Sequence, residues 1–215
     1  MTIDDIRETI LPLRQHDIGL QAWFQPSCEI QAPGQRYDAR EKRKVIQAGD
    51  LLWCDVGFSY LGLTTDQQQH AYVLKPGEQD APQGLKDALA AGNRLQDIHM
   101  AQMAIGRTGN QVLRATLEQA HAENLNPQVY SHPLGFHGHA AGPTMGLWDQ
   151  QAEVAGKGDY EIFDNTCYSI ELNVKHEIPE WGGQVVRIAP EEDAALVAGE
   201  MRWLDDRLTA FHLIG

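Results

Sequence analysis

Residues 50–74 constrain the fold most, because two strand-like stretches there each carry an aspartate. The segment is rich in residues that favour strands and is interrupted near residues 59–62 by a turn-like patch, so it predicts a β-hairpin. A two-residue turn centred on Tyr60 and Leu61 would place Asp55 directly opposite Asp66. Two like charges so placed destabilise a hairpin unless something neutralises them. A divalent cation would do so; the alternative is that each aspartate only ends a strand or caps a turn.

A second polar cluster lies between residues 131 and 143. His132, His137 and His139 stand there among small residues and glycines. Histidine is a common ligand of transition metals, and glycine lets backbone and substrate approach closely. The segment is therefore a candidate metal or substrate site, although one of these histidines could simply be a satisfied polar residue of the core.

Two further carboxylates are associated with strand-like runs. Residues 168–174 alternate so that Glu171 lies on the polar face and the aliphatic residues on the other, and a glutamate in the middle of such a strand is seldom buried without a partner. Glu191 begins an acidic run of three residues after the strand-like run VVRI. Taken alone, that run is typical of a solvated loop.

Together these residues balance the charge of two divalent cations, since four carboxylates and one imidazole carry four negative charges. The candidate ligands are Asp55, Asp66, His132, Glu171 and Glu191. Oxygen-rich ligation with one histidine favours Mn²⁺, Co²⁺ or Fe²⁺ over a structural zinc. Two such ions, roughly 3.5–4 Å apart, would activate a bridging water as a hydrolytic nucleophile.

The composition narrows the class of protein. The 215 residues are 42% hydrophobic, enough for one sizeable core, and the formal charge of -13 argues against nucleic acid or an anionic membrane as partner. Three scattered cysteines without a Cys-x-x-Cys pair indicate neither a disulfide framework nor a zinc-thiolate site. With no signal-peptide core and no apolar run near the roughly 18 residues that span a bilayer, the sequence predicts a cytoplasmic globular protein.

The remaining elements follow from periodicity and breakers. The sequence predicts an amphipathic helix over residues 3–16 that ends near Gly19, a strand over 20–24, a loop over 27–44, helices over 82–103 and 110–123, and strands at IELNV and VVRI. A helix-then-strand order occurs twice, which predicts a domain of two related α/β halves.

The order and spacing of the candidate ligands resemble those of the pita-bread metallopeptidases, the group containing methionine aminopeptidase, Xaa-Pro aminopeptidase and prolidase. Asp55 and Asp66 are eleven residues apart, and His132 and His139 are seven apart. SIELN supplies Glu171, and VRIAPEEDAALV supplies the last glutamate. The resemblance covers most of the chain and leans toward the prolidase and Xaa-Pro branch, whose EED ending it shares.

The resemblance implies an α+β pita-bread (creatinase/aminopeptidase-like) fold, with two pseudo-symmetric halves and a curved antiparallel sheet covered by helices, formed by residues 1–215 as one domain. It further implies two divalent ions, with Mn²⁺ preferred and Co²⁺, Fe²⁺ or Zn²⁺ as alternatives. His139 would steady the tetrahedral intermediate, and Glu171 or a neighbouring carboxylate would shuttle a proton. The expected substrate is an Xaa-Pro dipeptide or an N-terminal Xaa-Pro bond, and the protein could be a homodimer.

Three departures from the family pattern bear on these expectations. Ala189 and Pro190 separate the last strand-like run from the acidic run, so Glu191 is the preferred last ligand and Glu192 the alternative. No histidine lies between Asp17 and Asp55 to match the family's substrate-contacting one. The chain is also expected to lack the first catalytic-domain helix and the separate N-terminal domain of prolidases.

The departures leave two other functions open. One is a catalytically weakened or inactive homologue that acts as a binding protein. The other is metal-free chemistry on a small amidine or similar substrate, as in the creatinase relatives, against which the five candidate ligands speak.

Overall fold

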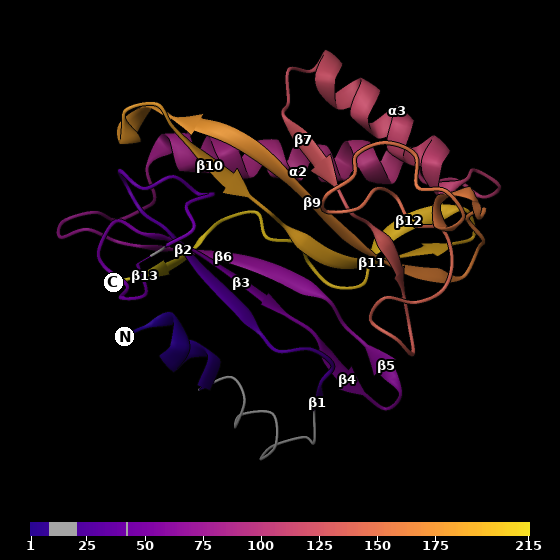
Figure 1. Cartoon of the computed structure of the whole chain (residues 1–215), viewed down its shortest axis with the longest axis horizontal. Coiled ribbons are helices and arrows are strands. Elements are labelled where there is room, and N and C mark those ends of the chain that lie inside the picture. The colour runs from indigo at the N-terminus through magenta and orange to yellow at the C-terminus, as the bar shows by residue number, and fades with distance from the viewer. Residues whose placement is uncertain (9–20, 42) are drawn as a thin grey trace.

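The computed structural model describes residues 1–8, 21–41 and 43–215, and it is built on a long curled antiparallel sheet (Figure 1). The strands are β1 (Gln21–Ala22), β2 (Ser27–Gln31), β3 (Leu51–Val56), β4 (Phe58–Tyr60), β5 (Leu63–Thr64), β6 (Gln67–Val73), β7 (Pro127–Val129), β8 (His132–Leu134), β9 (Thr166–Ile178), β10 (Gln184–Ile188), β11 (Glu191–Val197), β12 (Glu200–Trp203) and β13 (His212–Ile214). The helical elements are α2 (Gln83–Gln102), α3 (Gly109–Ala122) and the 3₁₀ turns η1 (Lys157–Asp159) and η2 (Pro179–Trp181). Residues 3–8 are also helical.

The main sheet is organised around β9. Its strand order is β10-β9-β11-β6-β3-β2, while β7 and β8 also pair with β9, β12 with β11, and β13 with β6. The β13–β6 pairing is parallel and the other pairings are antiparallel. Strands β1, β4 and β5 form a small separate sheet. Because β9 pairs with four strands, its side chains have neighbours from distant parts of the sequence.

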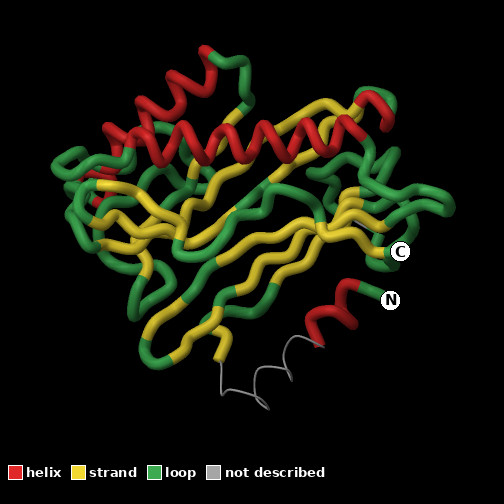
Figure 2. The backbone as a smooth tube through the Cα atoms, turned by 180° about the vertical axis from the view of Figure 1, so that it is seen from behind, coloured by secondary structure: helices red, strands yellow, loops and turns green. Residues whose placement is uncertain are grey.

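Helices α2 and α3 cover one face of this sheet, as Figure 2 shows from behind. The predicted alternation along β9 is confirmed: Tyr168, Ile170 and Leu172 are buried in the core, together with Leu85 and Leu89 of α2. Burial of each such side chain contributes roughly 1.5–3 kcal/mol. The intervening residues of β9 must therefore face away from the helices.

The hairpin predicted for residues 50–74 is present, but its turn lies one residue later than expected. Leu61 and Gly62 form the turn, with φ angles of 50° and 81°, the positive values that a two-residue type I′ turn requires and that glycine readily adopts. Ser59 therefore pairs with Thr64, and Asp55 pairs with Gln68 rather than with Asp66.

The other predicted elements have mixed outcomes. The helices over 82–103 and 110–123 and the strands at IELNV and VVRI are confirmed as α2, α3, β9 and β10. The loop over 27–44 is wrong at its start, because Ser27–Gln31 forms β2. Polar residues there hide an alternation in which Cys28 and Ile30 are buried.

Parts of two predictions fall outside the described residues. Of the helix predicted over 3–16, residues 3–8 are helical, and residues 9–16 lie outside the described residues. For the strand over 20–24, Gln21–Ala22 is β1 and residue 20 lies outside the described residues. No described helix is long and apolar enough to cross a membrane.

Candidate metal centre

Four polar side chains form one row across four neighbouring strands, on the sheet face turned away from α2. Each is directly opposite the next in the antiparallel register, and the row runs Asp55, Gln68, Glu191, Glu171. Neighbouring strands are about 4.7–4.9 Å apart. The row therefore gathers three carboxylates and one amide in a small space.

A second row lies two residues along the same strands and so shares the face. His132 of β8 is opposite Ser169 of β9, which is opposite Asp193 of β11. Asp193 accepts a hydrogen bond from the backbone N–H of Asp66, with an N–O distance of 3.2 Å. The two rows together bring all five predicted ligands to one place.

The register error in the predicted hairpin does not change the face of the sheet on which Asp55 and Asp66 lie. Asp55 is opposite Gln68, two residues beyond Asp66. Because side chains alternate with a period of two, a register shift of two residues returns each to the same face. Asp55 and Asp66 are thus diagonal neighbours instead of direct partners.

Distances within the cluster are those of a metal site. Ligand atoms lie within 4.8 Å of one another in each of three groups, which are Asp66–His132–His139, His132–Glu171–Glu191 and Asp55–Asp66–Glu191. His132 Nε2 is 3.6 Å from an Asp66 carboxylate oxygen and 3.8 Å from one of Glu171. The groups share members, so the described residues could hold more than one ion in adjoining positions.

The carboxylates of this cluster are poorly neutralised by the protein. Burial raises the pKa of Asp55 to about 6, while burial and the neighbouring carboxylates raise the pKa of Asp66 to about 9 and of Glu171 to about 8. For the same reasons the pKa of Glu191 lies well above its usual range. A bound cation would reverse this penalty, because it supplies the missing positive charge.

His132 is oriented as a ligand would be. Its side chain is almost fully buried, and its Nδ1 lies 3.1 Å from the carbonyl oxygen of Pro133. Since a carbonyl only accepts, Nδ1 carries the proton and Nε2 keeps a lone pair directed at the carboxylates. Among the described residues Nε2 has no hydrogen-bond partner. Burial lowers the pKa of His132 to about 4, so the ring is neutral near pH 7.

His139 lies at the open side of the cluster. Its ring is half-exposed and 4.1 Å from the His132 ring, between centroids, and its Nε2 is 4.0 Å from an Asp66 oxygen. The Tyr130 hydroxyl is 3.4 Å from Nδ1. If that hydroxyl donates, Nε2 of a neutral ring carries the proton and faces the site. Burial lowers the pKa of His139, which favours the neutral ring.

Trp23 packs over His139 from the side of the small sheet. The two rings meet edge to face with centroids 5.4 Å apart, and the Trp23 indole N–H donates to the Thr65 carbonyl. A Cβ added at Gly138 would lie 2.1 Å from the Trp23 ring. Glycine is therefore required at 138 for this close approach.

The choice between Glu191 and Glu192 follows from strand alternation. Glu191 lies in the first row, where Ser169 and Gln68 donate to it. Glu192 points to the helix-covered face, where the Gln96 side-chain amide and the Leu208 backbone N–H donate to it. Only Glu191 is in reach of the other candidate ligands.

The residues present fit divalent cations. Asp55 Oδ1 and His132 Nε2 are buried without a hydrogen-bond partner in the described part of the chain, and buried polar atoms in native proteins usually have one. Both belong to the ligand groups described above. Four carboxylates and one neutral imidazole form a donor set suited to hard or borderline divalent ions.

Two pockets open onto the cluster. One, of about 370 Å³, contains the carboxylates and has the aromatic walls Trp23, Phe24, Tyr130 and Trp148. The other, of about 790 Å³, lies on the far side of His139, with His137, Lys157 and Phe163 among its lining. A ligand at the cluster would thus contact aromatic rings on either side.

Gln68, Trp23 and Tyr130 belong to the site but were not among the predicted residues. Gln68 donates from its amide to both Glu171 and Glu191, and accepts from the Trp53 indole N–H. Placing the turn at Leu61 and Gly62 would have revealed Gln68, because that register puts it opposite Asp55. Tyr130 stands two residues before His132, but no sequence signal identifies Trp23.

The model of metallopeptidase family M24 matches residues 1–197. A solved X-Pro aminopeptidase from Thermotoga maritima is similar, with 17% identity and a TM-score of 0.72 over 100% of this chain and 56% of that one. Methionine aminopeptidase from the same organism has 15% identity and a TM-score of 0.65 over 94% of this chain and 85% of that one. The N-terminal domain of FACT complex subunit SPT16 from chickpea has 9% identity and a TM-score of 0.64, over 99% and 51%.

A curled antiparallel sheet with helices on one face is the pita-bread fold, as the sequence predicted. The chain belongs to metallopeptidase family M24. It spans between 53% and 56% of the length of the X-Pro aminopeptidase, prolidase and dipeptidase structures that it matches. No curated protein sequence matches it.

Proposed function

We propose that this chain is a divalent-metal-dependent peptidase that hydrolyses Xaa-Pro dipeptides or N-terminal Xaa-Pro bonds. The observation that carries the proposal is the pair of rows on the open face of the sheet, where carboxylates of three strands, a neutral histidine and a loop aspartate converge. Membership of the M24 family supports the same chemistry.

The proposed metal ligands are Asp55, Asp66, His132, Glu171 and Glu191. Two ions, with Mn²⁺ as the first choice and Co²⁺, Fe²⁺ or Zn²⁺ as alternatives, would supply an activated water and polarise the scissile carbonyl. The chain's own contribution is orientation. Gln68 holds one oxygen of Glu171 and one of Glu191, and leaves the second Glu171 oxygen directed at His132.

His139 is the proposed stabiliser of the tetrahedral intermediate. Its neutral ring, with Nδ1 near the Tyr130 hydroxyl, can present Nε2–H to a carbonyl oxygen that gains negative charge. Its half-exposed position at the mouth of both pockets allows direct contact with substrate. Nε2 lies 4.0 Å from an Asp66 oxygen, so this edge of the ring faces the candidate ligands.

Glu171 is the proposed proton shuttle. It lines the carboxylate pocket, and Gln68 holds only one of its two carboxylate oxygens. A carboxylate of this kind can accept a proton from the attacking water and return it to the leaving amine.

The preference for proline rests on the aromatic walls. Trp23, Phe24, Tyr130 and Trp148 surround the carboxylate pocket, and flat aromatic faces suit a rigid pyrrolidine ring better than a flexible side chain. The structural similarity to an X-Pro aminopeptidase and a prolidase supports this choice.

A binding role is the second candidate. The same fold occurs in a domain of the FACT complex subunit SPT16, and the sequence has no histidine between Asp17 and Asp55. His70 does not replace it, because its ring is buried and both nitrogens are engaged, with the Leu52 carbonyl and the Ala189 N–H. His137 is exposed and lines the larger pocket, so it can supply a substrate contact.

The test compares two dipeptides that share their first residue and end in proline or alanine. Protein that is stripped with a chelator and reloaded with Mn²⁺ is expected to hydrolyse the proline dipeptide with a higher kcat/KM than the alanine dipeptide. The stripped protein is expected to hydrolyse neither dipeptide. Asp66→Asn is the matched inactive control. Uptake of metal without hydrolysis of either dipeptide or of an N-terminal Xaa-Pro tripeptide would favour the binding role.

A further inference from the structure

Two cysteines face each other across the β2–β3 ladder. Cys28 of β2 is directly opposite Cys54 of β3, and their sulfur atoms are 3.3 Å apart. Both thiols are free. Cys54 immediately precedes Asp55 in the strand, so its side chain points away from the metal ligands. The pair is therefore separate from the candidate metal centre.

The backbone already has the spacing that a disulfide needs. Opposed residues of an antiparallel pair have Cα atoms about 4.5 or 5.5 Å apart, and both values fall within the range of about 4.4–6.8 Å found for disulfides. The sulfurs need to approach by little more than about 1 Å to reach bonding distance, near 2.0 Å. Side-chain rotation alone can supply this movement.

We propose that Cys28 and Cys54 form a redox-active dithiol that a hydroperoxide closes to a disulfide. Oxidation of this pair does not depend on peptidase activity, because the register of two strands alone brings the thiols together.

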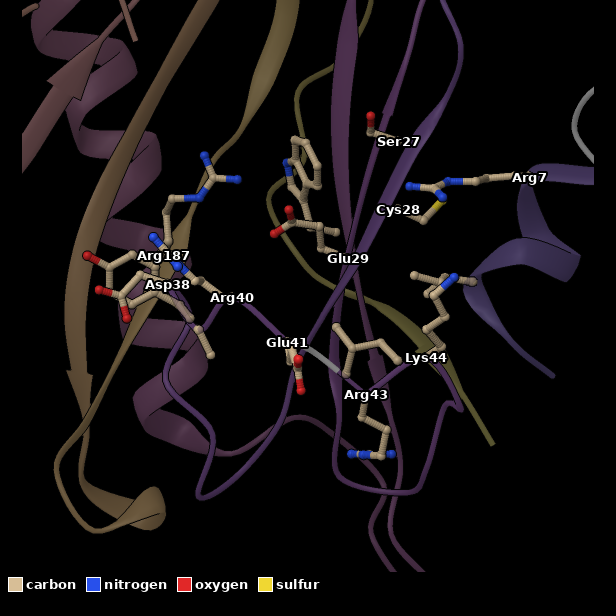
Figure 3. Close-up of a pocket in the computed structure, with 15 residues that line it drawn as sticks. Arg7, Ser27, Cys28, Glu29, Asp38, Arg40, Glu41, Arg43, Lys44 and Arg187 are labelled. Carbon is tan, nitrogen blue, oxygen red and sulfur yellow. The ribbon is translucent and has the colours of Figure 1, made fainter. Parts of the chain in front are cut away.

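A small oxidant can reach the pair from two sides. Cys28 lies on the wall of an open groove of about 940 Å³, beside Ser27 and Arg7, as Figure 3 shows. Both cysteines also line a smaller, apolar pocket of about 180 Å³ on which Ile3 and Ile6 pack. A hydroperoxide is small enough for either route.

The chemistry balances with the hydroperoxide as the only oxidant. The sulfur of Cys28, which lines the open groove, attacks the peroxide O–O bond, giving a sulfenic acid and releasing an alcohol, or water if the oxidant is hydrogen peroxide. The Cys54 sulfur then attacks the sulfenic sulfur, and water leaves. Two thiols are oxidised to one disulfide, and one peroxide is reduced.

Closure would tie an edge strand to its neighbour. β2 ends the strand order of the main sheet, so among the described strands it forms a ladder with β3 alone. A bond between residues 28 and 54 closes a loop within the chain and restricts the unfolded ensemble. We expect the oxidised protein to have a higher thermal midpoint than the reduced protein.

The test treats the folded protein with stoichiometric hydrogen peroxide, then alkylates it in denaturant and maps the peptides by mass spectrometry. The expected product is a cross-linked pair of peptides containing Cys28 and Cys54, about 2 Da lighter than the sum of the two. Cys167 is the internal control. It is opposite Ala195, so its thiol should stay reduced and be found alkylated. Disulfide formation in the folded protein should also be about 10-fold or more faster than in protein unfolded in urea, because folding holds the thiols together.

Two variants complete the experiment. Cys54→Ser should abolish the cross-link and the oxidative rise in thermal midpoint, whereas Cys167→Ser should preserve both. Equal rates of closure with and without urea would overturn the proposal. The proposal would also be overturned if Cys28 and Cys54 were found alkylated and Cys167 oxidised.

Discussion

The two faces of β11 hold adjacent glutamates in opposite ways. On the helix-covered face, burial raises the pKa of Glu192, and the hydrogen bonds that it receives from the Leu208 N–H and the Gln96 amide partly offset that rise. On the open face, Glu191 is surrounded by other carboxylates, which add to burial in raising its pKa. Burial alone therefore does not mark a metal site. The distinguishing feature of the candidate metal site is a group of carboxylates whose negative charge the protein leaves unneutralised.

The comparison predicts its largest effect at Glu191. Glu191→Gln should weaken Mn²⁺ binding by more than the roughly 10–100-fold that removal of a residue supporting a metal ligand costs. Any peptidase activity should fall with the metal. Elemental analysis after dialysis against Mn²⁺ measures occupancy, with about two ions per chain expected for the wild type. Glu192→Gln is the matched control, and equal metal loss in both variants would contradict the assignment.

The next effect is expected at His139. His139→Ala should leave the metal content nearly unchanged and lower kcat by about 10²-fold, the usual scale for loss of one stabiliser of a tetrahedral intermediate. Steady-state kinetics of the Mn²⁺-loaded variant measure this. The result distinguishes two roles for His139, metal ligand and stabiliser of the intermediate. Loss of metal in His139→Ala would make His139 a ligand, which its position beside Asp66 and His132 also allows.

A third prediction concerns pH. In the metal-free protein Asp66 and Glu171 have pKa values of about 9 and 8, above the ordinary values of 3.8 and 4.5. The folded state therefore binds protons that the unfolded state releases, and the stability they provide is fully present below about pH 4 and lost as pH rises toward 9. Urea unfolding in chelator should show a loss of several kcal/mol between pH 6 and pH 8.5.

Asp66→Asn tests the cause of that loss. The variant should be more stable than the wild type at pH 8.5 without metal, because one repelling charge is gone, and Mn²⁺ should stabilise it far less. With Mn²⁺ the wild type should instead gain stability with pH, since deprotonated ligands bind the ion better. If the metal-free variant and the metal-free wild type lose stability in parallel as pH rises, Asp66 is not a source of the loss.

Sequence reasoning reached the open face of the sheet because strand alternation has a short period. Glu171 could be placed from residues 168–174 alone, and the misplaced turn did no harm at Asp55 and Asp66 because the error was two residues. An error of one residue separates Glu191 from Glu192, and Ala189 and Pro190 obscured that count. Only the strand pairing shows that Glu191, and not Glu192, lies opposite Glu171.

Contacts between distant segments were beyond prediction. Trp23 meets His139 because the small sheet folds back on the loop after β8, and nothing in either segment indicates this. Cys28 and Cys54 are separated by 26 positions, so their spacing suggested no pairing until β2 was found beside β3. The polar composition of β2 hid that strand.

The smallest expected effect is at Glu192, on the helix-covered face. Glu192→Gln keeps the size of the side chain and removes its charge. Its new carbonyl oxygen can still accept from the Leu208 N–H, and Gln96 can turn its amide, because the Gln96 carbonyl oxygen has no partner among the described residues. We therefore expect a loss of about 1 kcal/mol in the free energy of unfolding, the difference between a charged and a neutral hydrogen bond, with metal content unchanged. Urea unfolding measures it, with Glu118→Gln on the exposed face of α3 as the control for loss of one negative charge. A loss of several kcal/mol would mean that the charge of Glu192 is needed to hold α2 on β11, and that the two faces differ less than their hydrogen bonds indicate.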